Sequence, residues 1–139
     1  MPFPIQQLIE GRSLPITISA DHSVETALGL MMKHDFSQLP ITDQNGQVQG
    51  IITSDSILRG LHFTKTTTTK LHVFDIKTDA LMCLPEDDIF DMLERMRNNY
   101  ACLVVNADKQ LVGIVTDFDT SEYFRRRAEN ISWRAKVLG

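Results

Sequence analysis

Two seven-residue stretches of the chain share a glycine, two β-branched residues and a threonine, and each continues with hydroxyl or carboxylate side chains. Residues 113–119 read Gly-Ile-Val-Thr-Asp-Phe-Asp, and residues 50–56 read Gly-Ile-Ile-Thr-Ser-Asp-Ser. At the start of a helix, Thr116 and Asp119 can form a capping box that satisfies free backbone N–H groups. The same geometry can hold a ligand, because a helix N-terminus suits a phosphate and a carboxylate accepts ribose hydroxyls. The residue types alone leave both uses open.

The elements around these stretches also occur twice, which indicates an internal repeat. Apolar residues at helical spacing mark one amphipathic helix in each copy: Val24, Ala27, Leu28, Met31 and Met32, then Ile89, Met92, Leu93 and Met96. A strand-like segment follows each helix, at 36–41 and 100–105, and a polar turn then leads into the glycine-initiated strand. The Asn45-Gly46 pair favours a hairpin. With apolar segments at 15–18 and 80–84, the sequence predicts an α/β fold of two β-α-β-β-α repeats.

Length and composition limit the classes of protein to which the chain can belong. The 139 residues carry a net charge of −4, with 42% hydrophobic and 23% charged residues, as is ordinary for a globular domain. The acidic balance argues against nucleic-acid binding. We expect no membrane span and no signal peptide, and therefore a cytoplasmic location. Basic residues near the C-terminus predict a solvated helix face or, alternatively, contact with a ligand phosphate or a partner.

No catalytic constellation is present in the sequence. The four histidines have no His-x-x-x-His or Cys-x-x-Cys partners, so we expect no metal site. Asp55, Asp117 and Asp119 lack a nearby nucleophile or base, which argues against an enzyme. Cys83 and Cys102 are expected to be buried reduced thiols rather than a disulfide or redox pair.

The repeats suggest four segments. Residues 1–63 hold an N-terminal segment, with a short helix at 5–9 stopped by Gly11, and the first repeat. Residues 64–74 form a threonine-rich linker and lead-in, and residues 75–127 form the second repeat. Residues 128–139 are expected to form a separate C-terminal helix, and the chain is expected to be one domain of a longer parent protein.

The ordered set of motifs resembles the CBS domain, a small regulatory unit named after cystathionine β-synthase, present here as a tandem pair. The matching elements are the methionine-rich helices, Asp75-Ile76-Lys77-Thr78, Leu39-Pro40-Ile41 and the 113–119 stretch. The likeness runs from about residue 16 to residue 127. It implies two pseudo-symmetric repeats packed through their sheets, with two clefts that bind adenosine-containing ligands.

The resemblance also implies site residues. The family's phosphate-contacting and ribose-holding positions fall on Thr116 and Asp119, with Thr78, Ala101 and Leu103 as candidate wall positions. A second, weaker site would use Thr53, Ser56 and Pro40, because the ribose position of the first repeat is a serine. Asp55 lies one residue early and points about 100° away around a helix. We therefore expect one good site.

The resulting hypothesis is a regulatory module that senses AMP, ADP, ATP or S-adenosylmethionine and is not an enzyme. The alternative is a pair without ligand that serves as a dimerisation or docking domain of a larger parent or effector protein. We also expect a homodimer, because Met31, Met32, Met92 and Met96 cannot all line one internal core, and methionine surfaces suit a helix–helix interface.

Overall fold

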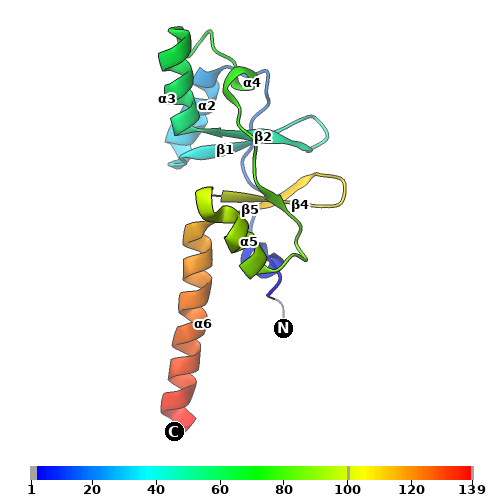
Figure 1. Ribbon diagram of the computed structural model, residues 1–139, viewed down its shortest axis with the longest axis vertical. Helices are drawn as coiled ribbons and strands as arrows, with labels where there is room; N and C mark the ends of the chain where they lie inside the picture. The colour runs from blue at the N-terminus through cyan, green and yellow to red at the C-terminus, as the bar shows by residue number, and fades with distance from the viewer. Residues whose placement is uncertain (1–2, 100, 139) are drawn as a thin grey trace.

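The chain folds into two consecutive units of similar order, stacked along the long axis (Figure 1). The computed structural model describes residues 3–99 and 101–138. The first unit contains α2 (Val24–His34), β1 (Gln38–Thr42), β2 (Val48–Thr53) and α3 (Ser54–Thr64). The second contains β3 (Met82–Cys83), α5 (Ile89–Arg95), η1 (Met96–Asn98), β4 (Ala101–Val105), β5 (Leu111–Thr116) and α6 (Asp117–Leu138). Two short helices, α1 (Gln6–Ile9) and α4 (Val73–Ile76), precede the units and connect them. The predicted α/β repeat is confirmed.

Each unit has an antiparallel hairpin in the same register. β1 pairs with β2 and β4 pairs with β5, and a register shift falls at Ile41/Thr42 and again at Val104/Val105. β3 adds a short parallel strand beside β4. The matching strand expected at 15–18 is reduced to one parallel bridge, in which the Ile18 N–H donates to Pro40 and the Thr42 N–H donates to Ile18.

The repeated amphipathic helices pack largely as their sequence pattern predicts, except that Met32 of the first stripe is exposed. In α2, Val24, Ala27 and Met31 are buried against the first sheet. The Ser23 side chain accepts a hydrogen bond from the Thr26 N–H and begins the helix, and Asp35 ends it in a left-handed conformation. The local sequence therefore fixes both the ends and the buried face of this helix.

Three apolar clusters form the interior. One lies within each unit, and the third lies between the two sheets and contains Val48, Ile51, Leu103 and Val105. All four of these side chains are buried. Since they come from both units, the third cluster joins the units through their sheets.

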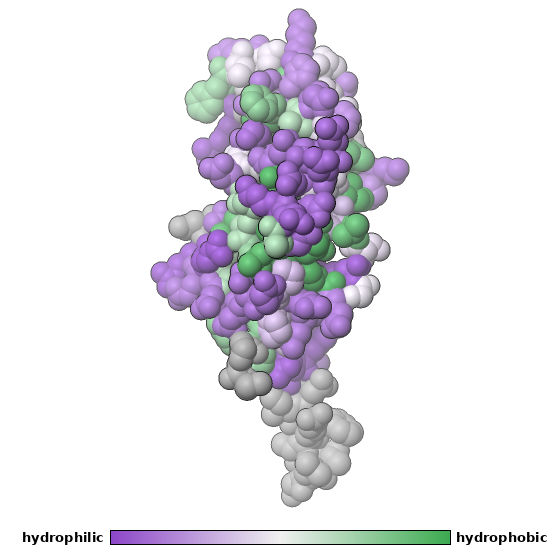
Figure 2. All heavy atoms as spheres, turned by 90° about the vertical axis from the view of Figure 1, so that its right-hand side faces the viewer, coloured by the Kyte–Doolittle hydropathy of each residue, from purple (hydrophilic) through white to green (hydrophobic). Residues whose placement is uncertain are grey.

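The two hairpin turns are also joined to each other. The Gln47 side-chain amide donates to the Asp108 carbonyl at 2.8 Å, and the Gln110 amide donates to the Asn45 carbonyl at 3.0 Å. The exchange is symmetric, as a pseudo-twofold relation between the repeats requires. Both turns point to the right in Figure 1, and hydrophilic side chains cover the middle of that face in Figure 2.

The N-terminal segment, residues 3–12, packs on the second unit although it precedes the first. Ile5 and Leu8 are buried in the second unit's cluster, and the Ile5 N–H donates to the Asp87 carbonyl at 2.9 Å. The expected short helix is present as α1, and Gly11 follows it with φ +78°. The expected grouping of this segment with the first repeat therefore differs from its packing.

The lead-in and the C-terminal segment are both continuous with the repeats. Leu71 and Val73, expected in the lead-in before the second repeat, are buried in the first unit's cluster. The C-terminal helix is not separate, because α6 runs without interruption from Asp117 to Leu138 and projects beyond the rest of the chain (Figure 1). Leu71 also accepts a hydrogen bond from the Val24 N–H at 2.7 Å, which ties this connection to the start of α2.

The methionines do not form the expected interface surface. Met31 is buried in the first unit, and Met92 and Met96 are buried in the second. Only Met32 of these four is exposed, at 80%. The four side chains occupy two separate cores and a surface position, so methionine content carries no argument for a dimer.

Substitution of Gly113 tests whether the N-terminal segment packs against β5. In Gly113→Ala the new Cβ would lie 2.8 Å from Ile9 Cγ2, so we expect a loss of about 1–3 kcal/mol in the free energy of unfolding. The matched control is Gly29→Ala in α2, where nothing lies within 4 Å and the gain should be about 0.5–1 kcal/mol. Urea unfolding measures both. Equal effects of the two changes would contradict this packing.

Candidate functional site

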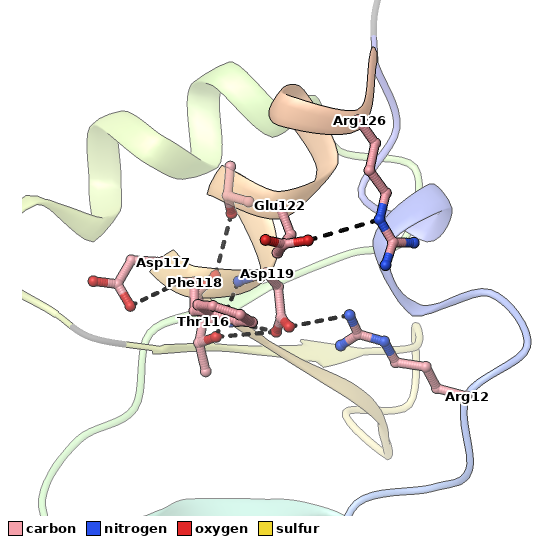
Figure 3. Close-up of polar contacts among 8 residues, drawn as sticks. Arg12, Thr116, Asp117, Phe118, Asp119, Glu122 and Arg126 are labelled. Carbon is pink, nitrogen blue, oxygen red and sulfur yellow. Dashed lines mark hydrogen bonds and ion pairs between the residues drawn. The ribbon is translucent and has the colours of Figure 1, made fainter. Parts of the chain in front are cut away.

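Thr116 and Asp119 form a reciprocal cap at the start of α6 (Figure 3). The Thr116 N–H donates to Asp119 Oδ2 at 2.9 Å, and Thr116 Oγ1 donates to the same oxygen at 3.1 Å. The Asp119 N–H donates back to Thr116 Oγ1 at 3.3 Å. The pair therefore caps the helix, and these hydrogen bonds hold the carboxylate in a fixed position beside the helix N-terminus.

The second oxygen of Asp119 has a partner from a distant part of the chain. Arg12 Nη2 lies 3.1 Å from Asp119 Oδ1, and the Asp119 side chain is only 18% exposed (Figure 3). Partial burial alone would raise the pKa of Asp119, but hydrogen bonds from Arg12 and from the Thr116 backbone, with the charge of Arg12, outweigh it. The pKa of Asp119 is therefore lowered, and the carboxylate is ionised at neutral pH.

The first unit repeats the cap without the carboxylate. The Ser56 N–H donates to Thr53 Oγ1 and the Thr53 N–H donates to Ser56 Oγ, both at 2.9 Å. Ser56 Oγ also donates to the Thr53 carbonyl at 2.9 Å. Asp55 points elsewhere, pairing with Arg59 at 2.9 Å on the exposed surface. No charged group takes the place of Asp119 at residue 56.

A cavity of about 250 Å³ lies beside Thr116 and draws its walls from both units. β1 and the turn before it provide one wall, β5 provides another, and the segment before Ile18 provides the third. The lining residues are Pro15, Ile16, Asp35, Phe36, Ser37, Gln38, Pro40, Ile114 and Thr116. The lining is mainly apolar with a few polar groups, which is the usual make-up of a small-molecule site.

The structure groups the expected site residues differently from the sequence-based assignment. Pro40, assigned to the weaker site, lines the cavity beside Thr116. Thr78, assigned to the Thr116 site, exchanges backbone hydrogen bonds with Ile51 at 2.9 and 3.0 Å and so lies beside β2. Each threonine motif therefore faces wall residues of the other repeat. The cause is the crossed packing of the two units through their sheets.

The remaining two wall candidates lie in β4. Ala101 is paired in register with Thr116, and Leu103 is paired with Ile114. Leu103 is completely buried in the cluster between the sheets. By strand register these two positions correspond to Gln38 and Pro40 of β1, both of which line the cavity beside Thr116.

Sequence reasoning missed Pro15, Ile16 and Arg12. Pro15 and Ile16 could have been found by aligning the repeats, since they precede the first helix as residues 80–84 precede the second. Arg12 lies outside the repeated pattern, and no sequence signal connects it to Asp119, which is 107 residues away.

A second, larger hollow of about 690 Å³ lies between the N-terminal segment and α6. Asp119 and Arg12 belong to its lining, and Asp119 is connected to the cavity beside Thr116 through its hydrogen bond with Thr116, which lines that cavity. The other lining residues are Gln7, Leu8, Glu10, Phe118, Glu122, Tyr123, Arg126 and Arg127. Its charges are mixed, and Arg126 Nε lies 3.7 Å from Glu122 Oε2 (Figure 3).

Three other features bear on function: possible metal ligands, the cysteines and possible membrane spans. Across residues 3–99 and 101–138, no group of three or more histidine, cysteine or acidic side chains is placed to hold a metal ion. Cys83 and Cys102 are buried free thiols, as expected. Among the helices described, none has both the length and the apolar character needed to cross a bilayer.

Curated relatives carry this region within much longer chains. An L-aspartate semialdehyde sulfurtransferase of Methanocaldococcus jannaschii is 33% identical over 113 residues, which cover 79% of this chain and 21% of that protein. A cystathionine beta-synthase of Dictyostelium discoideum is 24% identical over 116 residues, covering 81% of this chain and 23% of the relative. The chain spans about a fifth of the length of the curated relatives it matches.

Solved structures and a family model agree on the fold. The CBS domain pair of protein MJ0100, in complex with 5-methylthioadenosine and S-adenosyl-L-methionine, is 27% identical with a TM-score of 0.77, covering 91% of this chain and 99% of that one. The CBS domain of a membrane protein from Sphaerobacter thermophilus is 26% identical with a TM-score of 0.72, covering 87% of each chain. The CBS domain model matches residues 12–62 and 73–125. This chain therefore belongs to the CBS domain family, as a tandem pair of CBS domains.

Proposed function

We propose that the chain is a regulatory module that binds an adenosine nucleotide or a related adenosyl compound between its two repeats. The observation that carries the proposal is the cavity beside Thr116, which is walled by both repeats and adjoins an ionised, fixed carboxylate at a helix N-terminus. Apolar walls suit a purine base, the carboxylate suits the ribose, and the helix N-terminus suits a 5′ anionic group.

In this proposal each residue has a separate role. Asp119 accepts hydrogen bonds from ribose hydroxyls, and Thr116 lies beside the 5′ substituent at the helix N-terminus. Ile16, Pro40 and Ile114 frame the base. A second site beside Thr53 and Ser56, with Thr78 next to β2, would be weaker because Ser56 lacks the charge of Asp119, and the completely buried Leu103 gives it no open wall.

The ligand class is supported by a relative of the same fold. The MJ0100 domain pair binds 5-methylthioadenosine and S-adenosyl-L-methionine and matches this chain over 91% of its length. Both compounds contain the adenosine that the cavity lining suits. AMP, ADP and ATP share that adenosine and stay within the proposed class. A cytoplasmic location and a larger parent or effector protein remain predictions from the sequence.

Binding at Asp119 can be tested by changing the charge while keeping the shape. Asp119→Asn should weaken binding of the tightest ligand among AMP, ADP, ATP, S-adenosylmethionine and 5-methylthioadenosine by at least ~10-fold, because charge-assisted hydrogen bonds to ribose are lost. The matched control is Asp117→Asn, an exposed acid in the same first turn whose carboxylate accepts only from the Phe118 N–H within this turn. Isothermal titration measures both variants.

Two results would count against the proposal. If Asp119→Asn binds as tightly as the unchanged protein, the site assignment fails although the fold stands. If the unchanged protein binds none of the five compounds, the alternative of a ligand-free dimerisation or docking domain is favoured.

The cap contributes to stability in a pH-dependent way. Because the folded-state pKa of Asp119 is lowered, its contribution is present above the unfolded pKa and is lost as pH falls through the folded pKa. We expect Asp119→Asn to cost about 1–2 kcal/mol at pH 7 and the difference from the unchanged protein to shrink below about pH 4. Denaturant melts at several pH values check this. A difference that stays constant into acid would argue against an ionised cap.

A homodimer remains part of the proposal on grounds other than methionine content. Leu58, Phe63 and Phe118 on α3 and α6 are 67–77% exposed, and Met32 on α2 is 80% exposed. A contiguous patch of such side chains marks an association surface, and we propose that these residues form one in the dimer. Light scattering at micromolar concentration should give a mass about twice the 15.8 kDa of one chain. A single species at 15.8 kDa would exclude the dimer.

A further inference from the structure

Asp119 has little hydrogen-bonding capacity left for a ligand. An ionised carboxylate offers about four lone-pair sites. Oδ2 already accepts from the Thr116 N–H and from Thr116 Oγ1, and Oδ1 accepts from Arg12. Two ribose hydroxyls need two acceptor sites. At least one present partner must therefore leave when a ribose binds.

Arg12 is the partner that can leave. The cap bonds join residues three positions apart and are partly buried, whereas the Arg12 side chain is 45% exposed. Gly11, which precedes it, has φ +78° and no atom within 4 Å of its Cβ position, so the chain there has room to move. Because the Arg12 side of this ion pair is open to solvent, water screens part of its attraction to Asp119. Ribose hydroxyls can therefore compete with Arg12 for Oδ1.

The charges around the site indicate what the guanidinium of Arg12 can bind after it leaves Asp119. Asp35 is the charged residue in the cavity lining, and Asp119 is hydrogen-bonded to Thr116 of that lining. With Arg12 removed, these two carboxylates would oppose an anionic ligand and favour a neutral or cationic one. A guanidinium has five N–H donors, and its contact with Asp119 uses one of them. Once displaced, it can form the bidentate contact with a phosphate for which arginine is suited.

We propose that Arg12 sets the ligand preference of this site: ribose displaces it from Asp119, and it then pairs with the 5′-phosphate of an adenosine nucleotide. This inference rests on the proposed function and deepens it by naming a 5′-phosphorylated adenosine as the preferred class. Glu10, Glu122, Arg126 and Arg127 line the neighbouring groove, and Arg126 is paired with Glu122. Arg12 is the cation that contacts the ribose-holding carboxylate.

Three ligands with the same adenosine and different 5′ charge test the inference. AMP is anionic, 5-methylthioadenosine is uncharged and S-adenosylmethionine carries a cationic sulfonium. In Arg12→Gln, the ratio of AMP affinity to 5-methylthioadenosine affinity should fall at least ~10-fold, because a charge-assisted contact is lost for AMP only. Affinity for 5-methylthioadenosine should hold or rise, since its ribose no longer competes with an arginine. S-adenosylmethionine should gain most.

Two further variants separate charge at this position from general effects. Arg12→Lys keeps the positive charge and should retain most of the preference for AMP over S-adenosylmethionine. Arg59→Gln removes an equal charge from an exposed ion pair with Asp55 in the first unit and should leave all three affinities unchanged. Isothermal titration measures the three affinities, and melting curves show that each variant is folded.

The outcomes distinguish failure of this inference from failure of the proposed function on which it rests. If 5-methylthioadenosine binds the unchanged protein but Arg12→Gln leaves the AMP ratio unaltered, the inference is wrong and the proposed function stands. If Arg12→Gln weakens all three ligands equally, Arg12 only positions Asp119 and the inference again fails. If no compound binds the unchanged protein, both fail together.

Discussion

Burial of apolar side chains between the two sheets is the constraint on which the rest of the structure depends. Val48 and Ile51 from the first unit meet Leu103 and Val105 from the second, and all are buried. A two- or three-stranded sheet alone leaves such a face in water, and repeats of this size are stable only when they stack. The cavity beside Thr116 exists because of this contact, since its walls come from both repeats.

The threonine–carboxylate pair stabilises the start of α6, and the proposed function gives the same pair a second role in binding. Its hydrogen bonds within the cap hold Asp119 in place before a ligand arrives, and preorganisation of this kind reduces the entropic cost of binding. Ser56 satisfies the same backbone groups in the first unit without adding charge. The two caps are therefore equivalent for folding and different in the chemistry that they offer.

Local signals predicted more of this molecule than long-range ones. The first helix stripe apart from Met32, the turn at Asn45-Gly46 and the caps depend on neighbouring residues, and these features appear in the structure. Pro40 and Thr78 were assigned to the opposite clefts because a strand pattern fixes which face is buried but not which repeat lies across it. The contact of Arg12 with Asp119 is set entirely by the path of the N-terminal segment, and no period or motif encodes it.

The docking of residues 3–12 on the second unit has a consequence for the order of folding. Ile5 and Leu8 complete a core whose other members begin at Cys83, so this core cannot close until most of the chain has been synthesised. Contacts of such sequence separation carry a large loop-closure entropy and slow the search for the native state. The first unit has more local contacts and can therefore form early. The N-terminal segment stays exposed to solvent until the second unit forms. During translation, this segment would leave the ribosome before the first unit and would reach its final position after it.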